Sequence, residues 1–232
     1  MAVIYKGFYK DSAGTRAIEI KNDFNKLTTV IDGIVFSGSE FSDLCIIDKS
    51  KYTTDQLERF SFLSSKVYQT NLIQESLCNC SFELVAPQVI IDKLNNVELQ
   101  SDLKIEYSLG RVVYHDTWRC LEHERMALTL TIVSDTYTGT GDYFEGALDS
   151  IRDQMKDKYH FKNCYGCMYG DYSVYGQSSF GSMCCFMNQK EQYHKVTNKE
   201  EYMELEYPVR NVQEIYCCDQ YEIRKKGAGY RG

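Results

Sequence analysis

Three pairs of cysteines towards the C-terminal end of the chain could bind a metal ion or carry thiol chemistry. Cys164 and Cys167 form a C-x2-C pair, and adjacent pairs follow at Cys184-Cys185 and Cys217-Cys218. A C-x2-C turn presents two thiolates to one tetrahedral ion, and two cysteines from distant chain would complete a four-cysteine structural zinc site. Neighbouring residues of a strand point to opposite faces, so we expect one member of each adjacent pair to reach the ion.

Two other interpretations of these cysteines remain open. Unligated cysteines are among the most frequently buried residues, so the thiols could simply lie free in the interior. Disulfide or redox chemistry is the third interpretation. Disulfides suit secreted proteins, and a redox C-x2-C pair normally lies near a β-α-β pattern, which is not seen here. Structural zinc is the interpretation that we favour.

Catalytic motifs are missing around these cysteines. A zinc deaminase needs H-x-E before P-C-x-x-C, whereas His123 and Glu124 are adjacent and no proline precedes Cys164. The sequence also contains no H-E-x-x-H, G-x-S-x-G or P-loop motif. A nucleophilic pair of Cys167 with His160, or acid–base chemistry at Asp171, is the enzymatic alternative.

A stretch rich in tyrosine, glycine and serine follows the C-x2-C pair. Of the 19 tyrosines, 13 lie after residue 135. Tyrosine is enriched in binding surfaces because it offers a large contact area with a polar tip. We therefore predict a partner-binding surface, although the rings could instead form a small core around the metal. The residues predicted for this surface are Tyr169, Asp171, Tyr172 and Tyr175.

The elements that must position these residues differ between the two halves of the chain. Residues 1–135 read as short strands, clearest where Met126, Leu128, Leu130 and Ile132 alternate with smaller residues. Other strands are expected at 17–20, 31–36, 44–47, 82–85, 88–91 and 105–109, and a helical turn is expected at 54–60. Regularly spaced short strands favour an antiparallel sandwich or open barrel.

Residues 136–141 (TYTGTG) are the best candidate for a boundary between the halves. The helix that follows is the clearest in the sequence, since Phe144, Leu148, Ile151 and Met155 share one face. Asp142 is its predicted N-cap, with Glu145 completing a capping box. Short helical patches at 189–195 and 198–205 and a strand at 212–217 complete the C-terminal part.

Composition limits the class of protein. The chain has 232 residues with a net charge of −7, which argues against a nucleic-acid binder because such binding depends on basic residues. No stretch approaches the roughly 20 apolar residues of a membrane helix. The first residues, MAVIYKGFYKD, lack the apolar run of a secretory signal, so we expect a cytoplasmic protein unless a leader has been removed. The charged tail 224–232 reads as a solvated end or as a pairing partner for an acidic face, with anion binding as a minor possibility. Its basic residues are Arg224, Lys225, Lys226 and Arg231, and the acidic face carries Glu200, Glu201, Glu204 and Glu206.

The C-terminal stretches NCYGCMYGDYSVYGQSSFGSMCCF and VQEIYCCDQYEIRKKGAGYRG resemble the signature of an uncharacterised bacterial family, a domain of unknown function. Its pattern combines C-x2-C, Cys-Phe, Tyr-x-Cys and a Gly-Tyr-Arg-Gly end, and the resemblance covers roughly residues 142–232. The chain departs from it at Gly170 and Val174, where the family tends to have Ser and Pro. Carried over by position, the resemblance implies that the zinc ligands are Cys164, Cys167, Cys185 and Cys218.

These observations together predict an α+β protein with two parts packed together. Residues 1–135 form a β-rich domain, and residues 142–232 form a helix-containing domain organised by zinc. We expect a non-enzymatic binding protein whose partner is another protein, with a basic partner favoured by the acidic charge. Such a binding protein could act as an inhibitor, for example as a toxin-neutralising immunity protein. The alternatives are an enzyme that uses the cysteine cluster or Asp171, and a structural component of a larger assembly.

Overall fold

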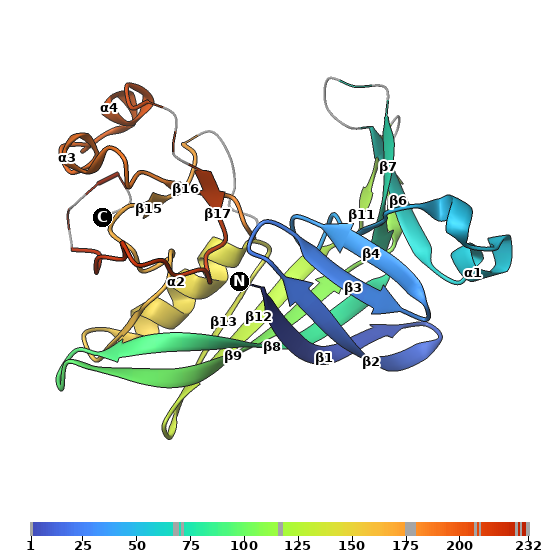
Figure 1. Cartoon of the computed structure of the whole chain (residues 1–232), viewed down its shortest axis with the longest axis horizontal. Helices are drawn as coiled ribbons and strands as arrows, with labels where there is room; N and C mark the ends of the chain where they lie inside the picture. Colours follow the sequence, from blue (N-terminus) through green and yellow to red (C-terminus); the bar gives the residue numbers. More distant parts are fainter. Residues whose placement is uncertain are drawn as a thin grey trace. The chain divides into compact units, whose positions relative to one another are not determined.

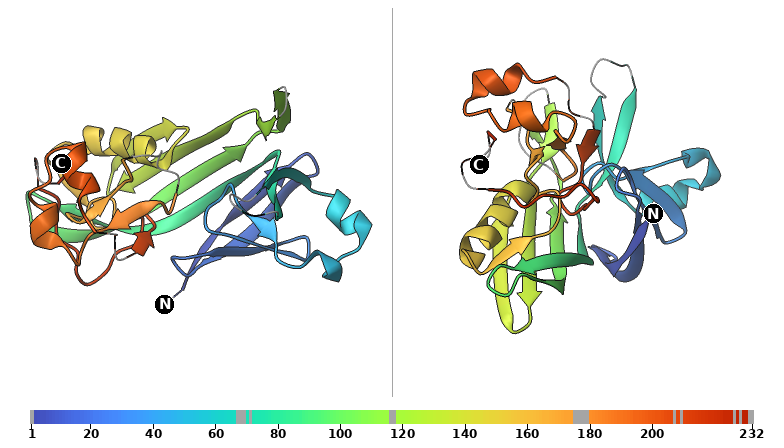
Figure 2. Two further views of the ribbon diagram at one scale, coloured as in Figure 1. Left: turned by 90° about the horizontal axis from the view of Figure 1, so that it is seen from above. Right: turned by 60° about the vertical axis from the view of Figure 1, so that its left-hand side comes forward.

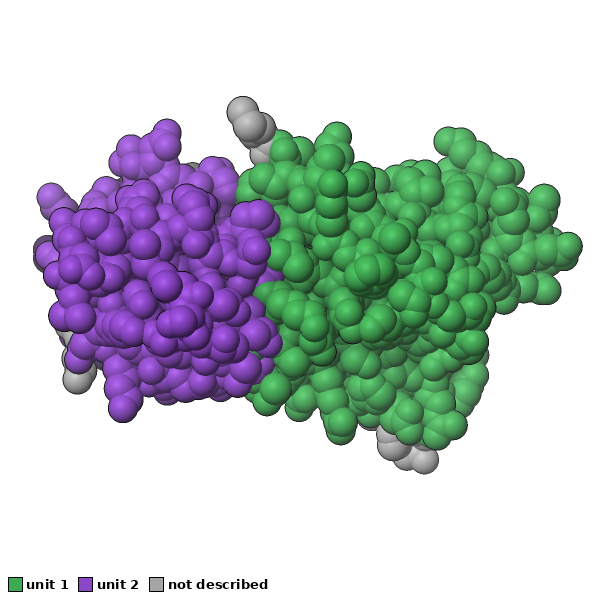
Figure 3. All heavy atoms as spheres, turned by 90° about the horizontal axis from the view of Figure 1, so that it is seen from below, with its two compact units in different colours: residues 1–86, 104–128, 140–142 green, residues 87–103, 129–139, 143–232 purple. Residues whose placement is uncertain are grey.

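The computed structural model describes residues 2–66, 70, 72–115, 118–174, 180–206, 208, 210–225, 227 and 229–230 (Figure 1). The chain divides into two compact units, which are coloured separately in Figure 3. Unit 1 contains residues 1–86, 104–128 and 140–142, and unit 2 contains residues 87–103, 129–139 and 143–232.

The N-terminal elements are mainly strands: β1 (Val3–Asp11), β2 (Gly14–Asn22), β3 (Leu27–Ile31), β4 (Ile34–Gly38), β5 (Cys45–Ile46), a 3-10 turn (Lys49–Lys51), α1 (Thr54–Glu58), β6 (Ser61–Lys66) and β7 (Ile73–Cys78). Longer strands follow: β8 (Cys80–Asp92), β9 (Val97–Leu109), β10 (Val112–His115), β11 (Trp118–Leu121), β12 (Glu124–Ile132) and β13 (Asp135–Gly141). The remaining elements all belong to unit 2: α2 (Phe144–Met155), β14 (Tyr159–Phe161), β15 (Gly170–Asp171), β16 (Met183–Cys185), α3 (Lys190–Tyr193), α4 (Lys199–Met203) and β17 (Arg210–Val212).

Antiparallel pairing organises the strands of both units, as the sequence pattern predicts. The hydrogen-bonded order of the main sheet is β13-β12-β9-β8-β1-β2-β3-β4-β5-β7-β6, with β14 on β8. Strands β8, β9, β12 and β13 contribute residues to both units. The alternation in β12 is confirmed, because its four predicted inward residues are all buried. The prediction of a β-rich protein with antiparallel sheets is therefore correct.

Two strand predictions are wrong in their boundaries. The segment 31–36, predicted as one strand, is a hairpin between β3 and β4, because Asp32 and Gly33 adopt positive φ angles of 47° and 83°. An Asp-Gly pair at such angles is a typical two-residue hairpin turn. Of the strand predicted at 212–217, only Val212 lies in a strand, at the end of β17. The residues after it form a turn in which the amide of Tyr216 donates to the carbonyl of Gln213.

Strand β8 is continuous where the sequence predicts two strands at 82–85 and 88–91. Along it, residues 81–85 pair with β1 and residues 90–92 pair with β14. Pro87 lies between these two paired stretches. It has no N–H group to donate, and at this position β8 is paired with neither β1 nor β14, so no hydrogen bond to those strands is lost. Residues 136–141, interpreted as a boundary, form most of strand β13.

Helix α2 confirms the predicted face, since Phe144, Leu148, Ile151 and Met155 are all buried. It packs closely on β13, since a Cβ atom on Gly139 would overlap the carbonyl oxygen of Ala147. In Figure 2 the helix, in yellow, lies along the strands of unit 2. The predicted capping box is wrong. Tyr143 occupies the N-cap and no side chain caps the helix, because residues up to Gly141 remain in strand β13 and the helix starts later. The shorter predicted helices correspond to α1, α3 and α4.

A cluster of four charged side chains stabilises the hairpin ends of unit 1. The Arg59 guanidinium donates to Asp11 Oδ2 at 2.7 Å and forms an ion pair with Asp32, to which Arg16 Nε also donates at 2.9 Å. Burial is the largest single influence on the pKa of Asp11 and raises it, but the hydrogen bonds from Arg59, the Ala13 amide and Tyr9, together with the charge of Arg59, outweigh burial and lower this pKa from its ordinary value. The ionised carboxylate is therefore favoured by folding.

We expect Asp11→Asn to lower the free energy of unfolding by about 2 kcal/mol, because a hydrogen bond to a charged group contributes about 1.5–3 kcal/mol. Urea unfolding followed by the fluorescence of Trp118, the single tryptophan, measures this loss. A lowered pKa stabilises the fold above pH 3.8, so the difference from wild type should shrink as the pH falls below that value. Glu58→Gln, an exposed change in the same unit, is the control. Equal losses in both variants would contradict the prediction.

Candidate functional site

The first two cysteines lie in a turn that backbone hydrogen bonds hold against the C-terminal segment of unit 2. The amide of Cys164 donates to the carbonyl of Tyr216 at 2.6 Å, and the amide of Met168 donates to that of Glu222 at 2.7 Å. Cys167 and Ile223 form a β-bridge. These contacts bring residues 164–168 beside residues 216–223, and therefore beside Cys218. We call residues 164–167 the knuckle.

A second set of backbone bonds brings Cys185 to the same place. Gly170 in β15 pairs with Cys185 in β16, and the amide of Phe186 donates to the carbonyl of Tyr169 at 2.9 Å. The residues that follow the knuckle therefore run alongside β16. Three chain segments far apart in sequence converge here, each carrying cysteine.

The thiols of these segments interact electrostatically with one another. Burial raises the pKa of Cys164, and the nearby thiols of Cys167, Cys185 and Cys218, together with Cys217, raise it further. Burial also raises the pKa of Cys185, which faces Cys167 and Cys218. Across the described residues, however, no group of three or more His, Cys, Asp or Glu side chains is arranged so that it could hold a metal ion. The structure therefore shows a neighbourhood of thiols, while the zinc-organised part stays a prediction.

Strand alternation separates the members of the first adjacent pair. Cys185 interacts with the knuckle thiols, whereas Cys184 lies near Tyr202 and 4.0 Å from Asn211 Oδ1. The second pair is not separated in this way. Cys217 is exposed, and it interacts with Cys218 and Cys167.

The knuckle is anchored to β14 through its glycine. His160 Nε2–H donates to the carbonyl of Gly166 at 2.8 Å, and the Gly166 amide donates to Asn163 Oδ1 at 3.1 Å. The Asn163 side chain in turn donates to Gln88 Oε1 in β8 at 2.8 Å. A Cβ atom on Gly166 would overlap the carbonyl oxygen of Phe161 and lie 3.0 Å from His160 Nε2. Only glycine fits this position without displacing β14.

Gly166→Ala should lower the free energy of unfolding by about 1–3 kcal/mol, the usual cost of forcing extra atoms into a packed interior. The matched control is Gly146→Ala in α2, where a Cβ atom would have nothing within 4 Å. That variant should gain about 0.5–1 kcal/mol, since alanine is the better helix former. Thermal unfolding of both variants tests the pair, and a Gly166→Ala protein as stable as wild type would contradict the anchoring role.

Three of the four residues predicted to bind a partner lie in the interior of unit 2. Tyr169, Asp171 and Tyr172 are all buried, and Tyr175 lies outside the described residues. Tyr169 donates to Glu222 at 2.9 Å, Tyr193 donates to Asp171, and Tyr172 donates to Glu214 at 3.3 Å. This burial favours the alternative interpretation, in which the rings form a small core.

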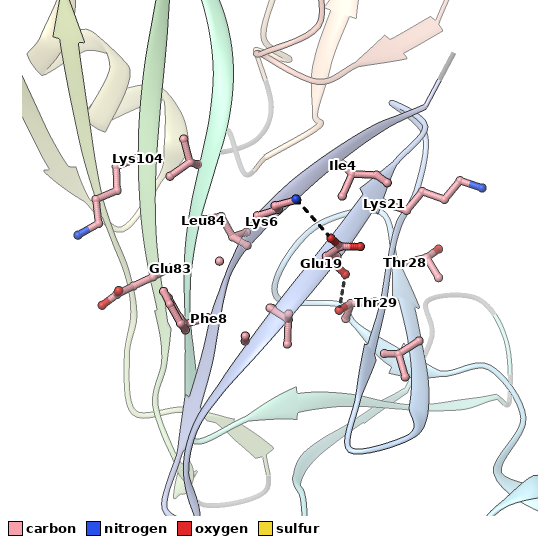
Figure 4. Close-up of a pocket in the computed structure, with 15 residues that line it drawn as sticks. Ile4, Lys6, Phe8, Glu19, Lys21, Thr28, Thr29, Glu83, Leu84 and Lys104 are labelled. Atoms are coloured by element: carbon pink, nitrogen blue, oxygen red, sulfur yellow. Dashed lines mark hydrogen bonds and ion pairs between the residues drawn. The ribbon is translucent and has the colours of Figure 1, made fainter.

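An exposed apolar surface on unit 1 has no counterpart among the sequence predictions. A groove of about 840 Å3 lies over strands β1, β2, β3 and β8, with Lys104 of β9 at its edge (Figure 4). Ile4, Phe8, Val30 and Val85 are 56%, 46%, 54% and 41% exposed there. In β1, Tyr5 and Tyr9 point into the core, so Ile4 and Phe8 occupy the opposite face of the strand. Apolar residues on both faces of β1 are the signal that could have revealed this groove.

Charged residues border the apolar part of this groove. Lys6 and Glu19 are paired across β1 and β2, and Lys6 Nζ lies 3.9 Å from Glu19 Oε1 (Figure 4). Glu83, which also lines the groove, forms an ion pair with Lys10. Phe8 lies across from Ala17 on one side and from Glu83 on the other. An apolar centre with a charged rim is the common composition of protein-binding surfaces.

Comparison with known proteins identifies a family. A family model described as a family of unknown function (DUF6304) matches residues 3–170. The predicted resemblance to an uncharacterised family is confirmed, although the match shares only residues 142–170 with the stretch on which that prediction rested. No curated protein and no solved structure matches the chain. In the described part of the chain, no helix is both long and apolar enough to cross a membrane.

Proposed function

Because this chain belongs to the DUF6304 family, whose function is unknown, we propose from its own geometry that it is a non-enzymatic protein that binds a partner protein through the groove of unit 1. The observation that carries the proposal is the set of four exposed apolar side chains in this groove. Contiguous apolar side chains are costly to leave in water, and such patches commonly mark interaction sites.

The charge of the molecule bears on which partner it binds. A net charge of −7 favours a basic partner, because opposite charges speed the encounter and disfavour wrong partners. The partner that we propose is a basic protein that places apolar side chains on Ile4, Phe8 and Val30. A toxin-neutralising immunity protein is the form of this function that we propose, since an inhibitor needs a binding surface without chemistry of its own.

The state of Asp171 and of two thiols of the cysteine cluster supports a non-enzymatic role. Burial raises the pKa values of the Cys164 and Cys185 thiols, and protonated thiols are poor nucleophiles. Asp171 accepts hydrogen bonds from the Tyr193 hydroxyl and from the backbone amide of Tyr172. Buried in this way, its carboxylate orders its own loop.

The second part of the proposal is that a structural zinc ion organises the knuckle region. The ligands that we propose are Cys164, Cys167, Cys185 and Cys218, whose thiols interact electrostatically and come from three converging segments. Sulfur-only donors suit tetrahedral zinc. Binding would deprotonate these thiols and tie the segments together, so metal affinity would contribute directly to folding.

To test the groove, we would change Phe8 and Val30 together to Glu. We expect the affinity for the partner to fall by at least 100-fold, because burying one large apolar side chain contributes about 1.5–3 kcal/mol and a buried charge adds a cost. The partner is first captured from the source cells and purified, and its affinity is then measured by surface plasmon resonance. Toxicity of the captured partner in a host cell, relieved by this chain, would identify an immunity protein.

Leu72→Glu is the matched control for this experiment. Leu72 is an exposed apolar residue of unit 1 outside the groove, so the Leu72→Glu variant should bind the partner with wild-type affinity. If the double variant bound as tightly as this control, the groove would not be the binding surface.

To test the metal, native mass spectrometry of protein purified without chelator should show one zinc per chain. Cys164→Ser should abolish it, whereas Cys184→Ser should retain it because Cys184 lies near Tyr202, away from the knuckle. Zinc absent from the wild-type protein, or lost equally in both variants, would remove this part of the proposal.

A further inference from the structure

A second pocket, in unit 2, has a composition unlike the rest of this acidic protein. Its volume is about 370 Å3, and the end of α2, strand β14, the knuckle and the C-terminal segment form its walls. Among the residues that the structure describes, five basic ones line it: Lys93, Arg152, Lys156, Arg224 and Lys225. None of the described lining residues carries a carboxylate. The pocket therefore concentrates positive charge in a chain with a net charge of −7.

Carboxylates outside the pocket neutralise some of these cations. Arg152 donates to Asp149 at 2.7 Å and to Asp153 at 3.0 Å, and Lys93 forms an ion pair with the exposed Asp157 at 3.4 Å. For Lys156 and Lys225, no ion pair occurs within the described part of the chain, and both side chains are exposed. These two lysines are the cations most able to pair with a bound anion.

The floor of the pocket is apolar. Met155, Tyr159, Phe161 and Tyr165 are buried, and the rings of Phe161 and Tyr165 meet edge to face with centroids 5.5 Å apart. Gly166 of the knuckle completes this wall, fixed by the hydrogen bond from His160. A ligand held here would rest an apolar or aromatic part on the floor, with its charged part at the basic rim.

The pKa of His160 reflects the positive electrostatic potential in this pocket. Burial lowers the pKa of His160, the hydrogen bond to Gly166 opposes this, and the positive charges of Lys93, Arg224 and Arg152 lower it further. The imidazole is thus kept neutral in a field of cations. An anion entering the pocket would reduce that field.

We propose that this pocket binds a phosphorylated small molecule of about mononucleotide size, with the phosphate between Lys156 and Lys225 and the apolar part on the aromatic floor. A multiply charged phosphate suits several converging cations better than a single carboxylate does. Phosphate alone is too small for the cavity, whose volume falls near the lower end of the range of about 300–1,000 Å3 for small-molecule sites. The proposal is independent of the groove in unit 1.

The test is isothermal titration of the full-length protein with AMP, inorganic phosphate and adenosine as probes. AMP should bind more tightly than either of the other two, because only AMP uses both the basic rim and the apolar floor. The double variant Lys156→Ala/Lys225→Ala should bind AMP at least tenfold more weakly. Affinity should also fall as the salt concentration rises, since ion pairs with exposed lysines are screened.

Lys195→Ala removes an exposed lysine of the same unit outside the pocket, and it should bind AMP as wild type does. All of these lysines are exposed, so unchanged circular dichroism spectra should show that the fold is retained. The proposal is overturned if wild type does not bind AMP at millimolar concentration, if adenosine binds as tightly as AMP, or if the double variant keeps wild-type affinity.

Discussion

The carbonyl and amide groups of Gly166 hold unit 2 together at the point where its segments converge. The carbonyl accepts from His160 Nε2 and from the backbone amide of Arg224, at 2.8 and 3.1 Å, while the amide donates to Asn163. One residue thus joins strand β14, the knuckle and the C-terminal segment. The thiol neighbourhood and the basic pocket both depend on this junction, since the knuckle forms part of each.

Strand β8 also joins separate elements, because it pairs with strands of both units. One stretch of it pairs with β1 in unit 1 and another with β14 in unit 2, and Pro87 stands between them. Proline has no amide to offer a neighbouring strand, so the pairing is interrupted there without leaving an unsatisfied donor. The residue that divides the pairing of β8 is also the first residue of unit 2 along this strand.

The two proposed binding places differ in the chemistry that they offer. The groove of unit 1 presents aliphatic and aromatic side chains on the open face of a sheet, which suits the side chains of another protein. The pocket of unit 2 is smaller and lined by cations, which suits a compact anion. The tyrosine-rich stretch between Cys167 and β16 contributes to neither place through Tyr169 or Tyr172, because those rings fill the interior of unit 2.

Much of the fold follows from local patterns in the sequence. The alternation in β12 and the apolar face of α2 are periodic, and periodicity reports directly which side chains face a core. The cysteine spacing likewise singles out the knuckle, because a C-x2-C turn is a local feature. The hairpin at Asp32-Gly33 was missed because a β-branched run on either side outweighed a turn signal that was present.

What only the tertiary structure decided involves contacts between segments far apart in sequence. The pairing of Gly170 with Cys185 determines which member of that cysteine pair faces the knuckle, and no local pattern contains it. Tyr169 is buried in a cluster with Phe186, Tyr193 and Tyr202, which arrive from later elements. The hydroxyl of Tyr202 also donates to the backbone carbonyl of Tyr172. The basic pocket likewise needs Lys93, Lys156 and Lys225 side by side. Composition and periodicity therefore determined the class of fold and the candidate thiols, whereas long-range strand pairing decided which side chains are buried and which meet at a surface.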